Sequence, residues 1–479
     1  MQHVRFVALS NILQNQYYDI NRYIIYQKNH FKIIVLKYII LLISIFLLKF
    51  NIFFSLFYLV LFFENIPSKI KKFQITPRIV RQFIIFEILN LFNLVFFFTL
   101  KNNIMKILII DVYNVILYWI SFFISYTIEY FIQIKNIKKA QKKLKMNHII
   151  FVAITGSYGK TSCKNYITSF LKQKYNVLQT PKSYNTLNGI LKTINEKLMP
   201  YHEIFVAEIG VDKINGMNKY IKSFPINIAV VTRIGNQHLK TFKNITNIKN
   251  EKTKLLKSAL DFAIINMDDS YLKDVAVNCT KITVSTQNTA NILIKLTQQN
   301  LTQSLLEVRI NNQKYDTYTK LLGLHNIENI ACAVGVAKAL NIDDKIILNT
   351  IKKLKNVEHR LSTLRLNNWL ILDDSYNSNF IGFCNALDIL NQAKNKKVII
   401  TPGIIEQGKN NYQNEILAKK IEEIADIILL VKNPSFGEKI SSKLDFKSFI
   451  EAYNYLHTHY YDQELTILIE NDLPDIYIK

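Results

Sequence analysis

Cysteine is scarce in this sequence, and what little there is excludes several classes of protein. The four cysteines among 479 residues, Cys163, Cys279, Cys332 and Cys384, are isolated and share no spacing typical of metal ligands. Such a set argues against a disulfide framework and against a zinc site, and it favours a reducing compartment.

Acidic residues are also in short supply. The chain has 36 Asp and Glu against 60 Lys and Arg, which gives a net charge of +24 at pH 7. A basic protein can bind nucleic acid, but these cations are spread through the chain and no basic helix with interleaved aromatic residues stands out. No nucleic-acid partner is therefore expected. The first 32 residues also lack the ordered regions of a removable signal peptide.

Long apolar blocks fill much of the first 145 residues. They run from Ile33 to Phe63, from Phe83 to Leu100 and from Ile104 to Ile128. Helices of about 20 apolar residues can cross a membrane, whereas a buried, all-helical soluble domain would show amphipathic stripes. The blocks predict a transmembrane helical region over residues 1–145, with three or four spans. Basic loops on one side predict a multi-pass protein of the cell membrane whose catalytic domains face the cytoplasm.

A glycine loop follows the first strong strand signal, in the sequence VAITGSYGKTS from Val152 to Ser162. Backbone N–H groups and the start of the following helix would form a cradle for phosphate. Lys160 would reach the β- and γ-phosphates and Thr161 would hold Mg²⁺. An ordinary glycine turn is the alternative, because the loop is shorter than the common pattern. The ATP-contacting residues expected here are Thr155, Gly156, Ser157, Tyr158, Gly159, Lys160, Thr161 and Ser162.

Apolar strands alternate with helices after this loop. The strands expected at Glu203–Ile209 and Ile226–Thr232 predict a doubly wound α/β domain. Glu208 stands at the carboxyl end of its strand, which is the edge where ligands bind in such sheets. A carboxylate at that edge suits the Mg²⁺ of a bound nucleotide.

Several separated motifs resemble those of the Mur ligases in kind and in order. They are Thr155–Ser162, Ala207-Glu208-Ile-Gly210, Asn236-Gln-His238-Leu, Leu324-His325-Asn326-Ile-Glu-Asn329 and Asp373-Asp374-Ser-Tyr376-Asn377-Ser-Asn379. The resemblance covers about residues 148–479. It is strongest to the branch of the family that adds D-alanyl-D-alanine to UDP-N-acetylmuramoyl-tripeptide.

This resemblance implies an ADP-forming ligase of peptidoglycan synthesis that uses ATP and Mg²⁺. The family activates a carboxylate as an acyl phosphate and joins it to an amine. The resemblance makes His238 a ligand of a second Mg²⁺ and Lys252 the position of a carbamylated lysine. Lys160, Glu208, His238 and Lys252 are thus the expected catalytic residues. Lys252 has Lys249, Lys254 and Lys257 as neighbours, so a solvated basic helix face is the competing interpretation.

The resemblance also assigns the remaining contacts. Further ATP-binding residues are His325, Asn326, Asn329, Arg360 and Asp373. Asn329 could equally be an ordinary helix cap. Substrate-binding residues are Ser183, Asn185, Asn188, Asp374, Tyr376, Asn377 and Asn379.

The expected domains are a transmembrane region over 1–145, a central ATP-binding domain over 146–356 and a Rossmann-like α/β domain over 357–479. Relatives carry a UDP-sugar-binding domain where this chain has its apolar region, so the muropeptide substrate could be UDP-linked or lipid-linked. The acceptor is an amino acid or D-Ala-D-Ala, and other cell-wall enzymes are candidate partners. A membrane-bound poly-γ-glutamate synthase and a membrane transporter or sensor with a regulatory NTPase domain are the alternatives.

Overall fold

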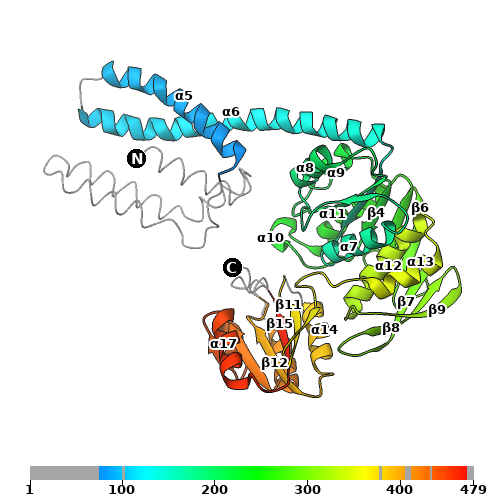
Figure 1. Cartoon of the computed structure of the whole chain (residues 1–479). Helices are drawn as coiled ribbons and strands as arrows, with labels where there is room; N and C mark the ends of the chain where they lie inside the picture. The colour runs from blue at the N-terminus through cyan, green and yellow to red at the C-terminus, as the bar shows by residue number, and fades with distance from the viewer. Residues whose placement is uncertain (1–74, 100–102, 377–379, 405–411, 432–433, 472–479) are drawn as a thin grey trace. The chain divides into compact units, whose positions relative to one another are not determined.

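The structure, a computed structural model, describes residues 75–99, 103–376, 380–404, 412–431 and 434–471 (Figure 1). The chain divides into two compact units, residues 1–135 and 136–479. The first unit is helical where it is described, and the second is α/β.

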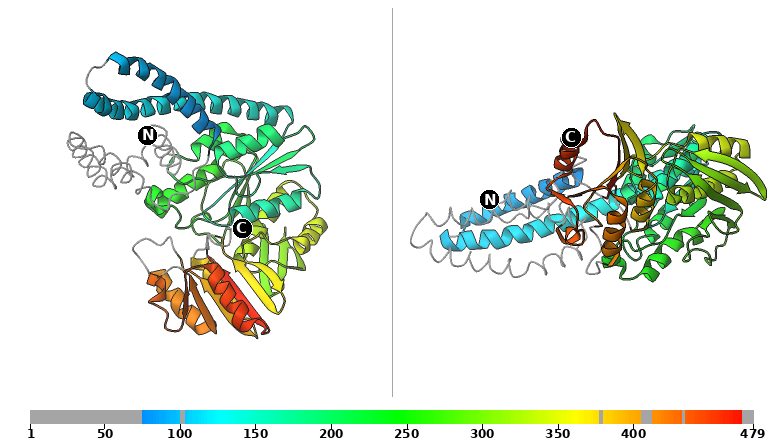
Figure 2. Two further views of the ribbon diagram at one scale, coloured as in Figure 1. Left: turned by 60° about the vertical axis from the view of Figure 1, so that its left-hand side comes forward. Right: turned by 90° about the horizontal axis from the view of Figure 1, so that it is seen from below.

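Two long helices make up the described part of the first unit. They are α5 (Pro77–Thr99) and the first part of α6 (Asn103–Met146), which run side by side (Figure 2). The Arg81 guanidinium pairs with the Glu129 carboxylate. The Arg78 guanidinium lies 5.9 Å from the ring centroids of both Phe122 and Tyr126. The two helices therefore hold each other through charged as well as apolar side chains.

The prediction of a multi-pass membrane protein is wrong. The apolar blocks at Phe83–Leu100 and Ile104–Ile128 are helical as expected, but no helix in the described ranges is long and apolar enough to cross a membrane. The block at Ile33–Phe63 lies outside those ranges. The apolar helices are interrupted by polar side chains, some of which are buried among the apolar ones. These side chains are Gln82, Asn90, Ser121 and Ser125.

A mixed sheet forms the core of the second unit, and the described strands follow the order β2-β3-β1-β4-β5-β6-β7-β8-β9. Neighbouring strands from β2 to β7 pair in parallel, and β7, β8 and β9 form an antiparallel extension. The strands are β1 (Ile150–Thr155), β2 (Val177–Gln179), β3 (Ile204–Glu208), β4 (Ile228–Val231), β5 (Phe262–Asn266), β6 (Thr280–Ser285), β7 (Ile292–Gln299), β8 (Ser304–Ile310) and β9 (Gln313–Thr319).

Helices cover both faces of this sheet, which confirms the α/β prediction. Alternate residues of β1 show the arrangement: Val152 and Ile154 join one apolar core, and Phe151 and Ala153 join the other. The first core includes side chains of α7 (Lys160–Leu171), α12 (Leu324–Ala339) and α13 (Asp344–Lys353). The second includes those of α8 (Leu187–Lys197), α9 (Asn218–Ser223), α10 (Leu239–Phe242) and α11 (Ile245–Lys257).

A second sheet is built from the last third of the chain, in the order β10-β11-β15-β12-β13-β14. Its neighbouring strands are parallel except for β10 and β11. The strands are β10 (Ser362–Leu366), β11 (Trp369–Asp374), β12 (Lys396–Thr401), β13 (Ile427–Val431), β14 (Leu444–Phe446) and β15 (Leu465–Glu470). The helices are α14 (Phe380–Leu390), α15 (Tyr412–Ile424), α16 (Pro434–Gly437) and α17 (Phe449–Tyr460).

The end of α6 belongs to the α/β unit, which therefore starts ten residues before the expected boundary at 146. Ala140 and Leu144 are buried in its second core. The Lys143 ammonium donates to the carbonyls of Asn195 (2.9 Å) and Leu198 (3.2 Å) at the end of α8. A cation there satisfies carbonyls that the helix leaves unpaired.

We therefore expect a fragment that starts at Asn136 to be more stable than one that starts at Met146. Losing the burial of Leu144 alone should lower the free energy of unfolding by about 1.5–3 kcal/mol. Urea denaturation of the two fragments measures this difference. Equal midpoints and slopes would show that the last turns of α6 contribute nothing to the fold.

Candidate active site

The glycine loop lies between β1 and α7, and its backbone is in close contact with two other segments. A Cβ atom on Gly156 would lie 2.0 Å from Oγ1 of Thr232, which follows β4. A Cβ atom on Gly159, where φ is +76°, would lie 2.4 Å from Oδ1 of Asn329 on α12. A side chain at either place would meet these atoms, so both positions require glycine.

Ser157 fixes the loop to the segment after β4. Its amide donates to the Arg233 carbonyl (2.6 Å). Its hydroxyl donates to the Gly235 carbonyl and accepts from the Gly235 amide, both at 2.9 Å. The Thr232 hydroxyl donates to the Tyr158 carbonyl at 2.5 Å. No local sequence pattern indicated these contacts with the segment after β4, because they depend on β1 and β4 being neighbours in the sheet.

Tyr158 lies directly over Gly235, and the Tyr158 hydroxyl donates to the Asn236 carbonyl (3.3 Å). A Cβ atom on Gly235 would lie 2.4 Å from Cε2 of the tyrosine ring. We expect Gly235→Ala to destabilise the protein by about 1–3 kcal/mol through overpacking. Adding Tyr158→Ser should recover part of that loss, which thermal denaturation of the single and double variants would measure. A Gly235→Ala variant as stable as the original chain would contradict this close packing.

Lys160 begins α7, and its ammonium folds back onto the loop. It donates to the carbonyls of Gly156 (3.0 Å) and Ser157 (3.2 Å). Burial lowers the pKa of Lys160; the Glu208 carboxylate opposes this shift, and the charge of Arg360 adds to it. The side chain is therefore held at the mouth of the cradle.

Glu208 lies beside the loop because β3 pairs with β1 in parallel, which places Glu208 opposite Ile154. The buried carboxylate accepts from the Thr161 hydroxyl (2.8 Å) and from the Asn185 amide (3.1 Å). A hydroxyl, a carboxylate and an amide group thus converge at the edge of the sheet. The oxygens of Thr161 and Glu208 suit a magnesium ion.

Lys252 lies on the inner side of α11 and is 1% exposed. Its ammonium donates to the Ser157 hydroxyl (3.1 Å). Burial, and to a smaller extent the charge of Lys160, holds the pKa of Lys252 well below its usual range. The neighbouring Lys254 instead pairs with Glu251 (2.7 Å), and Lys257 is exposed. A solvated basic face therefore describes other lysines of α11 but not Lys252.

His238 ends the segment after β4 and lies just before α10. It is exposed, and its backbone has a φ of +55°. Ser183, which precedes Asn185, and Asn188, in the first turn of α8, are also exposed. These residues lie in segments that adjoin the glycine loop or Glu208.

Two predicted site residues at the start of α12, His325 and Asn326, lie in different surroundings. Asn326 is buried, where its side chain donates to the Leu322 carbonyl (2.8 Å) and accepts from the Tyr166 hydroxyl (2.9 Å). Its amide group is thus used within the interior. The Nδ1 atom of His325 is buried without a hydrogen-bond partner among the described residues. Burial lowers the pKa of His325 to about 4, so the ring is neutral at pH 7.

The segment His359–Leu361 is held by the last two residues of β11. Asp373 accepts from the ring of His359 (2.7 Å), and Asp374 accepts from the amide of Leu361 (3.0 Å). The Arg360 guanidinium lies 4.2 Å from the centroid of the Tyr376 ring. Burial raises the pKa of Asp374 to about 6, although Arg360 opposes the shift. Asn377 and Asn379 lie outside the described residues.

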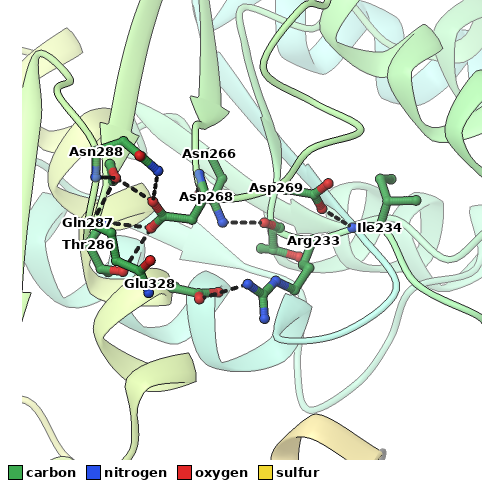
Figure 3. A network of polar contacts seen from close by, with 11 residues as sticks. Arg233, Ile234, Asn266, Asp268, Asp269, Thr286, Gln287, Asn288 and Glu328 are labelled. Atoms are coloured by element: carbon green, nitrogen blue, oxygen red, sulfur yellow. Dashed lines mark hydrogen bonds and ion pairs between the residues drawn. The ribbon is translucent and has the colours of Figure 1, made fainter.

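A polar network at the ends of β4, β5 and β6 was not foreseen (Figure 3). Asp269 accepts from the Ile234 amide (2.6 Å), and Asn266 donates to the Thr232 carbonyl (3.0 Å). Arg233 pairs with Glu328 of α12 (3.0 Å). Its members are far apart in the sequence, so no local motif could have revealed it.

Comparisons with known proteins agree on a family. The family described as the Mur ligase middle domain matches residues 154–337. A UDP-N-acetylmuramoyl-tripeptide–D-alanyl-D-alanine ligase of Buchnera aphidicola is 29% identical over 305 residues, which cover 60% of this chain and 65% of the relative. A ligase of the same description from Borreliella burgdorferi is 25% identical over 340 residues, covering 68% of this chain and 70% of the relative. The chain thus spans slightly less than two thirds of the Buchnera relative's length.

Solved structures show the same fold. MurF from Acinetobacter baumannii matches with a TM-score of 0.64 and 21% identity, covering 71% of this chain and 77% of the other. MurF ligase from Thermotoga maritima, solved in complex with ADP, matches with a TM-score of 0.65 and 22% identity, covering 72% and 81%. At these identities the likeness establishes the fold alone.

Proposed function

Because this chain carries the Mur ligase middle domain, we propose that it is an ATP-dependent, ADP-forming amide ligase of peptidoglycan precursor synthesis. The proposed reaction joins D-Ala-D-Ala to the carboxylate of a UDP-N-acetylmuramoyl-tripeptide. The observation that carries the proposal is the convergence of the glycine loop, the Thr161–Glu208 pair and the buried Lys252 on one edge of the sheet. The activity named for the Buchnera and Borreliella relatives supports the choice of substrates.

The first part of the proposed site holds ATP and its metal. The glycine loop would surround the phosphates with backbone N–H groups, and Lys160 would turn from its loop carbonyls to the phosphate oxygens. Thr161 and Glu208 would hold Mg²⁺, which neutralises phosphate charge when bound. Asn185 would keep the Glu208 carboxylate in place through its existing hydrogen bond.

The second part of the proposed site concerns Lys252 and His238. A carbamate forms when an unprotonated amine attacks CO₂, so that an N–C bond forms and a proton leaves. The low pKa of Lys252 supports this assignment, since burial already favours the neutral amine. The carbamate and the exposed His238 would hold a second Mg²⁺ near the substrate carboxylate.

The remaining residues of the proposed site would contact either ATP or the substrates. His325 and Asn329 would line the adenine side, and the partnerless Nδ1 atom of His325 suits a ligand contact. The interior contacts of Asn326 favour a structural role. Arg360 would reach the phosphates and Asp373 the ribose, from a C-terminal domain over 357–479 that closes on a central domain over 146–356. The proposed substrate contacts are Ser183, Asn185, Asn188, Asp374, Tyr376, Asn377 and Asn379.

A UDP-linked substrate is preferred to a lipid-linked one, because the membrane prediction on which the lipid link rested is wrong. The poly-γ-glutamate synthase and NTPase-sensor alternatives drew on the same prediction. Neither has support in the comparisons, which name muropeptide ligases.

The test is direct. Purified protein is incubated with ATP, Mg²⁺, UDP-N-acetylmuramoyl-tripeptide and D-Ala-D-Ala, and the products are identified by mass spectrometry. We expect the pentapeptide product with one ADP released per bond. Parallel reactions with glutamate as acceptor, or without any acceptor, separate the alternatives. ADP release without an amide product would overturn the proposal.

A further inference from the structure

The glycine loop, the segment after β4 and the first turns of α12 contact one another in pairs. The loop contacts the segment after β4 through Ser157, whose amide and hydroxyl bind Arg233 and Gly235. It contacts the first turns of α12 where Gly159 lies against the Asn329 side chain. The third pair, between the segment after β4 and α12, is the ion pair of Arg233 and Glu328.

This ion pair links the two segments that each contact the glycine loop. Glu328 immediately precedes Asn329, and the Arg233 carbonyl is the acceptor for the Ser157 amide. A shift of the Arg233 side chain would therefore be transmitted to the loop from two sides. Figure 3 shows the Arg233 guanidinium turned toward the Glu328 carboxylate.

We infer that Glu328 and Arg233 are positioning residues for nucleotide binding, which hold the glycine loop in its phosphate-binding shape through their ion pair. The inference rests on the proposed ATP site. Neither residue is placed against the nucleotide. Both act through Ser157 and Asn329.

The charges around Glu328 make the contact sensitive to pH. Burial raises the pKa of Glu328 to about 7; Arg233 opposes the shift, and Asp268 and Asp269 add to it. Glu328 is therefore charged, and its ion pair complete, above about pH 7, and it is neutral below. Because the folded pKa is raised, folding stability falls as pH rises from the unfolded value of 4.5 through about 7. The ionised carboxylate thus costs stability while it holds the loop.

This combination separates positioning from simple stabilisation. Glu328→Gln removes the charge but keeps the shape, so the variant should be no less thermally stable than the original chain at pH 8. It should nevertheless bind Mg·ADP about fivefold more weakly at pH 8.5, the loss of one hydrogen-bonded charge contact. At pH 5.5 the two proteins should bind Mg·ADP alike, because the side chain at position 328 is then neutral in both.

A double-variant cycle tests the contact itself. Arg233→Gln should weaken Mg·ADP binding about as much as Glu328→Gln, and the double variant should bind no worse than either single one. Glu307→Gln is the matched control, because Glu307 forms an exposed ion pair with Arg309 (2.7 Å) elsewhere on the sheet. Hydrogen exchange over residues 156–160, measured without nucleotide, should be faster in Glu328→Gln and unchanged in Glu307→Gln.

The outcomes can be told apart from a failure of the proposed function. If the original chain does not bind Mg·ADP, the ATP site is wrong, and hydrogen exchange alone decides whether the pair holds the loop. If the original chain binds and both single variants bind equally well, the positioning role is overturned. Independent losses that multiply in the double variant would also overturn it. Should Glu328→Gln fail to fold, Arg233→Gln and Arg233→Lys test the same contact, with recovery expected only in the lysine variant.

Discussion

Alanine at Lys252 should abolish ligation, and acetate or formate in the buffer should restore part of it. The proposed carbamate supplies the anion that holds the second Mg²⁺ together with His238, so its loss should lower kcat by about 10²–10³-fold. A small carboxylate can enter the space left by the shortened side chain. Rates of amide formation with and without added carboxylate measure both effects.

Stability provides an independent check on Lys252. Its folded pKa lies below the unfolded value, so protonation opposes folding and stability is lost as pH falls below about 10. Lys252→Met, which keeps the apolar stem without the amine, should therefore be inactive but at least as thermally stable at pH 7. If Lys252 served only in packing, Lys252→Met would not lose activity while keeping its thermal stability.

The other lysines of α11 are the matched controls for this experiment. Lys249→Ala, Lys254→Ala and Lys257→Ala should each keep most of the activity, because these side chains are exposed, partly exposed or paired with Glu251. Equal, mild losses at all four lysines would rule out the carbamate. Loss at Lys254 alone would show that the assignment is out of register.

Alanine at Lys160 should abolish ATP turnover, also by about 10²–10³-fold or more in kcat. The ammonium is the cation held at the mouth of the glycine loop, and the charge on the β- and γ-phosphates would lose its main partner. ADP release and amide formation should fall together. Near-normal ligation would remove the glycine loop from the proposed site.

A lysine further along the same helix provides the control. Lys172 caps the end of α7 and is exposed, so Lys172→Ala should leave turnover within about twofold. Equal losses at Lys160 and Lys172 would indicate damage to α7 rather than loss of a phosphate contact.

Local patterns predicted the glycine loop and the parallel strands well. The loop has a motif, and strands buried on both faces read as continuous apolar runs. Glu208 could be placed because carboxyl ends of parallel strands meet at one edge. Arg233 and Glu328 could not be paired, since 95 positions separate them and only the sheet order brings them together.

The apolar helices show the opposite failure. The apolar blocks within α5 and α6 predicted membrane spans, but neither helix, where described, is long and apolar enough to cross a membrane. Polar side chains such as Gln82 and Ser121 are buried in these helices, and they read from the sequence as isolated interruptions. The packing partners of each helix decide this case, and hydropathy averaged along the sequence does not identify them.

Asp268 and Asp269, which follow β5, have a consequence for how the chain finds its fold. Asp268 accepts hydrogen bonds from Thr286 and Asn288 beyond β6, whereas Asp269 accepts from Ile234 beyond β4. Interior parallel strands that are apolar on both faces can slide by one residue without exposing a polar group to the core. A slip of β5 in either direction would break the contacts to both neighbours at once. The two adjacent carboxylates therefore fix the register of β5 relative to β4 and β6. A one-residue deletion in β5 should trap misaligned chains during refolding, even though every strand remains apolar.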